Sequence, residues 1–165
     1  MKSGNNSPRW HARAGAESNE SDLEKLGRLI RAYASHDGSF DLRIPGVYAS
    51  RLSRVNKECA HVLRLPSLCI IAQGAKTVIV GQEVYEYDAS RMIVFSVALP
   101  IAAQVTQASF GEPYLALRFD LDASKIAELV LKVFPRGLPP VEERRAVDMT
   151  SVDASIVNAA SRLIE

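Results

Sequence analysis

The sequence predicts a mainly β protein, with one closed or sandwiched antiparallel unit, a helix before it and helices after it. Three observations predict this fold class. The chain has 165 residues, which is enough for one domain with a sizeable core. From about Phe40 to Phe119 it reads as short strands separated by turns, without an intervening helix. On both sides of this region apolar residues instead recur at helical spacing.

The first helix is expected to begin near Ser21. Residues 1–20 are rich in Ser, Asn, Gly, Ala and Arg, and we expect them to form a disordered arm or to be a remnant of cloning. The sequence Ser-Asp-Leu-Glu at 21–24 is a capping box, in which the hydroxyl and the carboxylate each satisfy a free backbone amide. One apolar face follows, made of Leu23, Leu26, Ile30 and Tyr33, and Gly38 is free to take the turn that ends the helix.

The strands follow as short apolar or alternating runs. They are expected at 46–52, 60–65, 76–80, 83–87, 92–97, 101–106 and 114–119. The clearest hairpin spans 76–87, because a two-residue loop with Gly first suits a type II′ turn at 81–82. In that register Ile79 lies opposite Val84.

Two amphipathic helices are expected after the strands. The first begins at Asp122 and carries the apolar face Ile126, Leu129, Val130 and Val133. A proline-rich stretch at 135–140 breaks the chain, and the last helix, beginning near Ser151, carries Ile156, Ala160 and Leu163 on one side. It is still running at Glu165, so we expect the chain to be truncated. These two faces are candidates for a dimer interface, and the alternative is that both cover the open side of the barrel.

Composition excludes several classes of function. The net charge is +1, with 20 basic and 19 acidic residues, whereas a domain that grips DNA phosphates usually carries a basic excess. No apolar run approaches the length of a membrane helix, and the N-terminus lacks the apolar centre of a signal peptide, so we expect a cytoplasmic protein. Cys59 and Cys69 fit neither a redox pair nor a zinc pair, and we expect both to be reduced.

Catalytic and metal motifs are absent from the sequence. Metal-dependent β-barrel enzymes need a cluster of His with a carboxylate. The three histidines here, His11, His36 and His61, are far apart in the sequence. No nucleophile elbow and no phosphate-binding glycine motif occurs. We therefore expect no metal, no cofactor and no enzyme activity.

Scattered polar residues on the strands are the candidates for a ligand pocket. They lie in or beside runs that are otherwise apolar, and they are Gln73, Ser96, Gln104, Thr106, Tyr114 and Arg118. If they point inward, they supply the few polar groups that a pocket in a small barrel needs. If they point outward, they form the solvent face of an antiparallel sheet.

Several segments resemble the N-terminal domain of AraC-type transcription regulators. The most specific is RLPSLCIIAQGAK at 64–76, and GQEVYEYDAS at 81–90 follows it. Shorter matches are PGV at 45–47, SVALP at 96–100 and EPYLAL at 112–117. The resemblance covers roughly residues 41–165.

The resemblance implies a cupin-like barrel, that is, a double-stranded β-helix or jelly roll, followed by helices that mediate homodimerisation. In the family a DNA-binding domain with two helix-turn-helix motifs comes next, and this chain contains no such pair. Regulatory members lack the metal-binding histidines of enzymatic cupins, and their effectors vary widely.

We therefore expect residues 1–20 to be the arm, 21–121 the helix and barrel, and 122–165 the dimerisation and linker helices. The expected function is to sense an unknown small molecule and to control DNA binding through the missing domain. The alternatives are a stand-alone cupin-like binding protein or enzyme, and a dimerisation module with a filled barrel.

Overall fold

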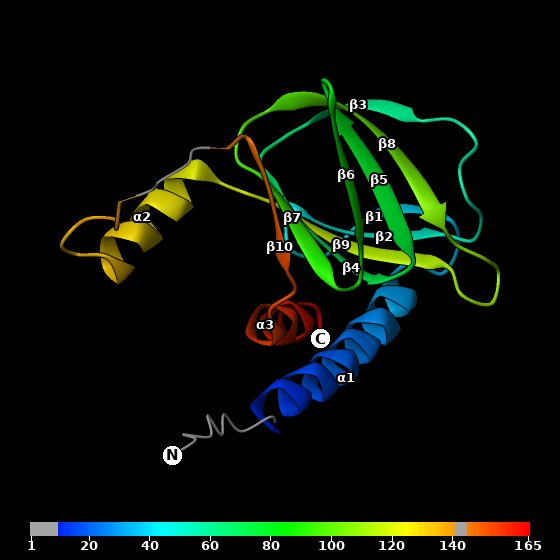
Figure 1. The fold of residues 1–165 in the computed structure, drawn as a ribbon, viewed down its shortest axis with the longest axis horizontal. Helices are drawn as coiled ribbons and strands as arrows, with labels where there is room; N and C mark the ends of the chain where they lie inside the picture. The colour runs from blue at the N-terminus through cyan, green and yellow to red at the C-terminus, as the bar shows by residue number, and fades with distance from the viewer. Residues whose placement is uncertain (1–9, 141–144) are drawn as a thin grey trace, which may run out of the picture.

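The computed structural model describes residues 10–140 and 145–165 and shows two antiparallel sheets packed face to face (Figure 1). The six-stranded sheet has the order β1-β2-β9-β4-β7-β10, and the four-stranded sheet has the order β3-β8-β5-β6. The strands are β1 (Gly38–Asp41), β2 (Val47–Leu52), β3 (Ala60–Arg64), β4 (Ser67–Gln73), β5 (Ala75–Val80), β6 (Glu83–Asp88), β7 (Arg91–Phe95), β8 (Leu99–Gln107), β9 (Tyr114–Asp120) and β10 (Val147–Ser151). The predicted cupin-like, mainly β fold with flanking helices is confirmed.

The six-stranded sheet separates two apolar cores. The first lies between this sheet and the helices and includes Leu26, Ile70 and Leu117. The second lies between the two sheets and includes Ile71 and Phe95. Because side chains alternate along a strand, Ile70 and Ile71 of β4 serve different cores. This makes β4 a central strand that is buried on both faces.

The β5–β6 hairpin has the predicted register. Ile79 pairs with Val84, and Val78 pairs with Tyr85. Gly81 has φ +60°, and no residue other than glycine in the described ranges has a positive φ. A type I′ turn would require a positive φ at the second turn position as well, so the loop follows the predicted type II′ geometry.

The first helix is longer than predicted. Helix α1 spans Trp10–Tyr33, so the capping box at Ser21 does not begin it, and the part of the predicted arm from Trp10 onward is helical. Alanines recur at 12, 14 and 16, and alanine has the highest intrinsic helix propensity, which favours a helix through this polar stretch. Residues 1–9 lie outside the described residues.

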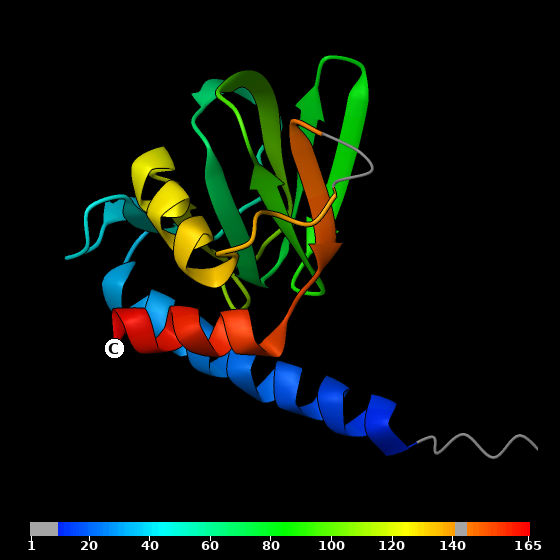
Figure 2. The ribbon, with the colours of Figure 1, turned by 90° about the vertical axis from the view of Figure 1, so that its left-hand side faces the viewer.

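The last helix begins later than predicted. Ser151 ends strand β10, which pairs with β7, and Asp153 caps helix α3 (Ala154–Ile164) through its carboxylate. Strand β10 was not predicted, because Val147 is its only fully buried residue and its alternation is weak. Helix α3 packs beside α1 under the six-stranded sheet, and both lie below the strands in Figure 2.

Helix α2 (Ala123–Val133) begins at Asp122 as predicted, with the Asp122 carboxylate accepting the backbone N–H groups of Ser124 and Lys125. It has no buried residue and projects away from both sheets (Figure 1). None of the described helices is long and apolar enough to cross a membrane.

Candidate functional site

Polar side chains enter the space between the two sheets from several strands. On β9, Leu115 and Leu117 belong to the helix-side core, whereas Tyr114 and Ala116 belong to the core between the sheets. Arg118 continues the second series, so alternation directs it between the sheets. A charged side chain in this position is the first sign of a site in the barrel.

Lys76 reaches the same space from the opposite sheet. It lies two residues before Val78, which is buried in the core between the sheets, and so faces the same way along β5. Its Nζ lies 6.0 Å from the centre of the Tyr114 ring. Its two strand partners, Val105 and Tyr87, are also buried in that core.

Arg64 is the third basic residue with this orientation. It is the last residue of β3 and pairs with Leu99, which belongs to the core between the sheets. Its Nε is buried and has no hydrogen-bond partner among the described residues. We call Arg64, Lys76 and Arg118 the interior cation cluster.

The electrostatic environment agrees with this convergence. Burial raises the pKa of the Cys69 thiol, and the positive charges of Arg64, Lys76 and Arg118 partly oppose this rise. Burial lowers the pKa of Lys76, and the two arginines lower it further, while Cys69 acts in the opposite direction. All three cations therefore lie close enough to Cys69 to act on the same buried thiol.

Two buried tyrosines complete the surroundings. Burial raises the pKa of both Tyr87 and Tyr114, so both phenols stay protonated at physiological pH. A protonated phenol donates a hydrogen bond to an acceptor. Arg64 lies near enough to both rings to oppose their shifts.

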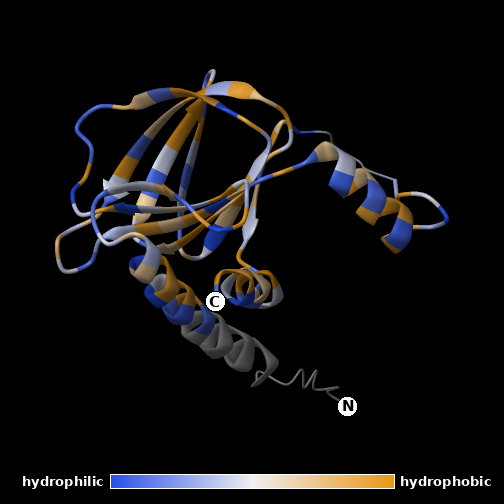
Figure 3. Ribbon diagram, turned by 180° about the vertical axis from the view of Figure 1, so that it is seen from behind, coloured by the Kyte–Doolittle hydropathy of each residue, from blue (hydrophilic) through white to orange (hydrophobic). Residues whose placement is uncertain are grey.

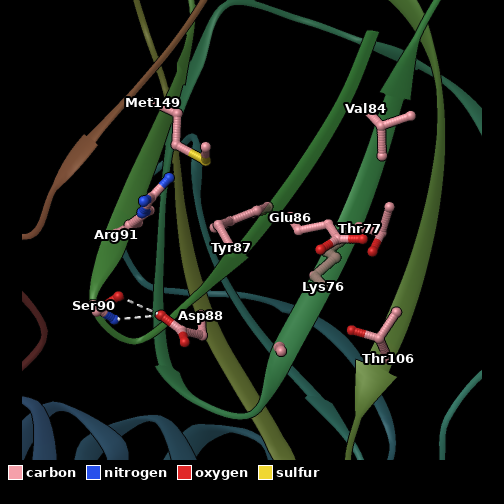
Figure 4. A pocket seen from close by; sticks show the side chains of 11 residues that line it. Lys76, Thr77, Val84, Glu86, Tyr87, Asp88, Ser90, Arg91, Thr106 and Met149 are labelled. Carbon is pink, nitrogen blue, oxygen red and sulfur yellow. Dashed lines mark hydrogen bonds between the residues drawn. The ribbon is translucent and has the colours of Figure 1, made fainter.

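An open cavity of about 880 Å³ gives access to this region. Lys76 and Tyr87 line it from β5 and β6, and Arg91 and Met149 line it from β7 and β10. Figure 4 shows Tyr87 between Arg91 and Met149 on one side and Glu86, Thr77 and Thr106 on the other. The cavity thus lies along β6, the edge strand of the four-stranded sheet, and reaches the interior at Lys76.

Three of the six predicted pocket residues form hydrogen bonds to other structural elements, and one of them, Gln73, also lines a second open cavity of about 540 Å³. Gln73 Nε2 donates to Pro113 O over 2.7 Å, and its Oε1 accepts from Arg31 of α1 over 3.1 Å. Gln104 Nε2 donates to Asn56 O over 2.6 Å. The exposed Ser96 Oγ donates to the backbone carbonyls of 145 and 146. Their polar groups are occupied by the protein itself.

The other three predicted pocket residues lie at or near the cavity. Tyr114 and Arg118 face the space between the sheets, and the exposed Thr106 lines the open cavity with Lys76. The sequence analysis missed Arg64, the last residue of β3, and Lys76, the second residue of β5, because both lie close to turn residues. The hairpin register contained the signal for Lys76, since it places Lys76 on the same face as Val78.

The residues predicted for a dimer interface differ in their exposure. On α2, Ile126, Leu129 and Val133 are 39%, 58% and 65% exposed, and Val130 is half-buried. On α3, Leu163 is 48% exposed, Ile156 packs partly against the helix-side core, and Ala160 is buried in it. Ala160 is therefore covered within the chain and cannot contact a partner directly.

The thiols and the described acidic and imidazole groups form no metal centre. Cys59 and Cys69 are both free, and Cys59 Sγ lies 3.8 Å from Gln104 Oε1. Among the described residues, no three His, Cys, Asp or Glu side chains come together as a ligand set. Of the three histidines, His11 has a side chain outside the described part.

Comparisons with known proteins agree with this fold. A family model described as the AraC-type transcriptional regulator N-terminus matches residues 43–165. Among curated proteins no significant match was found.

Solved structures of ToxT share the fold. ToxT from Vibrio cholerae, in its P21 crystal form, is similar with a TM-score of 0.53 at 17% identity, over 72% of this chain and 46% of that chain. ToxT from Vibrio cholerae O395 bound to (E)-4-(8-methylnaphthalen-1-yl)but-3-enoic acid gives a TM-score of 0.54 at 15% identity, with the same coverage. A cupin protein from Bacteroides fragilis gives 0.36 at 16% identity, over 53% of this chain and 79% of that one. The chain thus spans less than half the length of the ToxT structures, and the likeness shows the shared fold.

Proposed function

Because the chain belongs to the AraC-type transcriptional regulator N-terminus family, we propose that it binds a small-molecule effector in its barrel and joins two copies of a regulator. The effector controls DNA binding by the DNA-binding domain of that regulator. The protein works in the cytoplasm, and it catalyses no reaction.

One observation carries the effector-binding part. The barrel core is not wholly apolar, because it contains three basic side chains and two protonated phenols, of which Lys76 and Tyr87 line an open cavity of about 880 Å³. Small-molecule sites combine apolar walls with a few convergent polar groups, as here. ToxT, which shares the fold, has been solved with an aryl butenoic acid bound.

The exposed face of α2 supports the dimerisation part. Ile126, Leu129 and Val133 are exposed on one face of a helix that has no buried residue. Figure 3 shows hydrophobic and hydrophilic positions alternating along α2, which stands apart from the two sheets. Burying apolar surface contributes about 25 cal/mol per Å², which favours covering this face. The occupant that the family suggests is the same helix of a second copy, across a twofold axis. Ile156 and Leu163 of α3 extend the candidate interface, whereas Ala160 on the same helix is buried.

The two parts are connected through packed elements. An effector changes DNA binding only by its difference in affinity for two arrangements, typically a coupling of about 1–3 kcal/mol. Strand β9 lies in both cores, through Tyr114 on one face and Leu117 on the other. Leu117 packs in the core that also contains α1 and α3. A shift of β9 on binding thus reaches the helices.

The experiment combines ligand screening with mass in solution. We expect compounds from a small-molecule library to raise the melting temperature, since a ligand that binds only the folded state stabilises it. We expect Leu129→Glu to convert a dimer into a folded monomer in sedimentation. Ser124→Glu adds the same charge on the polar face of α2 and should leave the dimer intact. A library without a stabilising compound would contradict effector binding, and a dimeric Leu129→Glu variant would remove α2 from the interface.

A further inference from the structure

We propose that the interior cation cluster binds the carboxylate of an organic acid, so that the effector of this domain is an anion with an apolar body. This inference rests on the proposed function, because it names the chemical class of the ligand that the barrel holds. Arg64, Lys76 and Arg118 supply the positive charge, from strands β3, β5 and β9 of the two facing sheets.

The charges between the sheets do not balance. Arg118 Nε pairs with Asp120 Oδ1 over 3.0 Å. Neither Arg64 nor Lys76 forms an ion pair within the described residues, and the buried Nε of Arg64 lacks a hydrogen-bond partner there. Two of the three cations therefore have no counter-charge among the described residues.

An uncompensated charge inside a protein is costly, and buried charges are normally paired. Here two such charges also repel each other and Arg118. The lowered pKa of Lys76 reflects this cost, first through burial and then through the neighbouring arginines. An anion bound among them would relieve the repulsion and return the pKa of Lys76 toward its usual value.

The surroundings favour a carboxylate with an apolar body over a small inorganic ion. The walls between the sheets are apolar, with Ile71, Val78, Ile93 and Phe95 fully buried. A guanidinium presents paired N–H donors that match a carboxylate, and protonated phenols add O–H donors. Tyr87 provides both a ring and a hydroxyl at the point where the open cavity meets the interior.

The route to the cluster starts at the exposed side of the cavity. Thr106 and Glu86 are exposed, whereas Lys76 is half-buried and Tyr87 is buried. A ligand that enters along β6 therefore meets Lys76 and Tyr87, the two residues of the cluster and its surroundings that line the cavity. Lys76 is the residue whose replacement tests the inference most directly.

The test compares acids with their amides. Octanoate, benzoate and 4-(1-naphthyl)butanoate, each beside its primary amide, are added at constant ionic strength to a buffer free of other carboxylates and of phosphate. We expect at least one acid to raise the melting temperature by about 5 °C or more at roughly 100 times its Kd. Its amide has no charge and should raise it far less.

Variants assign the effect to the cluster. Lys76→Gln should weaken binding of the acid about 10- to 100-fold, since it removes one charged hydrogen bond. Lys76→Arg keeps the charge and should restore most of the affinity. Lys57→Gln removes the same charge from an exposed loop residue and should change nothing. Melting without ligand shows that each variant is folded, and Arg64→Gln repeats the test if Lys76→Gln is not.

The outcomes separate this inference from the proposed function. It is overturned if no acid in the panel stabilises the protein, if an amide stabilises it as much as its acid, or if Lys76→Gln retains full affinity. A neutral compound that stabilises the protein and still binds Lys76→Gln would support effector binding. It would contradict only the inference that the effector is an anion. Failure of the panel and of the wider library together would contradict both.

Discussion

Arg118 lies over the ring of Tyr48, with its Cζ 3.9 Å from the ring centre. The two residues are direct partners in the pairing of β2 with β9. The side chain of Arg118 is also held by the ion pair with Asp120. The guanidinium is thus held at two points, by a residue of the neighbouring strand β2 and by one of its own strand.

We predict a measurable coupling between Arg118 and Tyr48. In a double-mutant cycle of Arg118→Gln and Tyr48→Leu, measured by urea unfolding, the interaction free energy should be about 1 kcal/mol. The exposed pair of Arg54 and Phe110, separated by 5.2 Å, serves as the control and should give a smaller value. Equal interaction free energies in the two cycles would contradict the expectation that partial burial strengthens the contact between Arg118 and Tyr48.

Asp37 should make stability depend on pH. Its carboxylate accepts from the backbone N–H of Ser53 over 2.9 and 3.0 Å and from the Ser53 hydroxyl over 2.7 Å. The bond from the backbone N–H is the main cause that lowers the pKa of Asp37 in the folded state, and the hydroxyl bond and the charge of Arg51 add to it. The unfolded carboxyl titrates near pH 4, with a pKa of about 3.9.

The direction in which stability changes with pH follows from this lowered pKa. The unfolded state binds a proton before the folded state as the pH falls, so the contribution of Asp37 is fully present above about pH 5. It is lost as the pH falls through the folded-state pKa. The difference in unfolding free energy between the wild type and Asp37→Asn should therefore shrink between pH 6 and roughly pH 2–3. Asp41→Asn, which alters a carboxylate without a hydrogen bond among the described residues, should show little change, and a constant Asp37→Asn difference would contradict the assignment.

The fold was predictable where local rules and tertiary packing agree. The β5–β6 hairpin follows from Gly81 and the alternation around it, and the cap at Asp122 follows from its side chain. Strand β10 was not predictable, because it is a short edge strand whose pairing with β7 depends on a distant segment. The start of α1 was misplaced, since a capping box marks a possible helix start but does not stop a helix that already runs through it.

The candidate site was predictable only in part. Alternation identified Arg118 as opposite in direction to Leu117, but it could not say which face of β9 meets the other sheet. Gln73 and Gln104 attract attention as polar residues in apolar runs, yet both bond to backbone carbonyls of distant loops. Only the packing of the two sheets brings Arg64 and Lys76 together.

Gly74 should tolerate substitution less than Gly81. A Cβ at Gly74 would lie 2.5 Å from Gln107 O and 3.1 Å from Tyr114 Cα, and the backbone φ is +86°. We expect Gly74→Ala to cost about 2–5 kcal/mol, as the sum of left-handed strain and overpacking. Gly81 has φ +60° with open space around its Cβ, so Gly81→Ala should cost about 1–2 kcal/mol from strain alone. Urea unfolding of both variants checks this, and equal costs would argue against the close approach to Gln107.

Replacement by Glu should destabilise the protein strongly at Ala160 and hardly at all at Leu163. Ala160 is buried in the core that α3 shares with α1, where Tyr33 Oη also donates to Ile164 O over 2.8 Å. Ala160→Glu places an unpaired charge in this core and should cost about 3 kcal/mol or more in unfolding free energy. Leu163 is 48% exposed, so Leu163→Glu should change the stability of the monomer by no more than about 0.5 kcal/mol. Urea unfolding at low protein concentration measures both variants apart from any dimer. A large cost for Leu163→Glu, or a negligible one for Ala160→Glu, would mean that α3 presents the other side to α1.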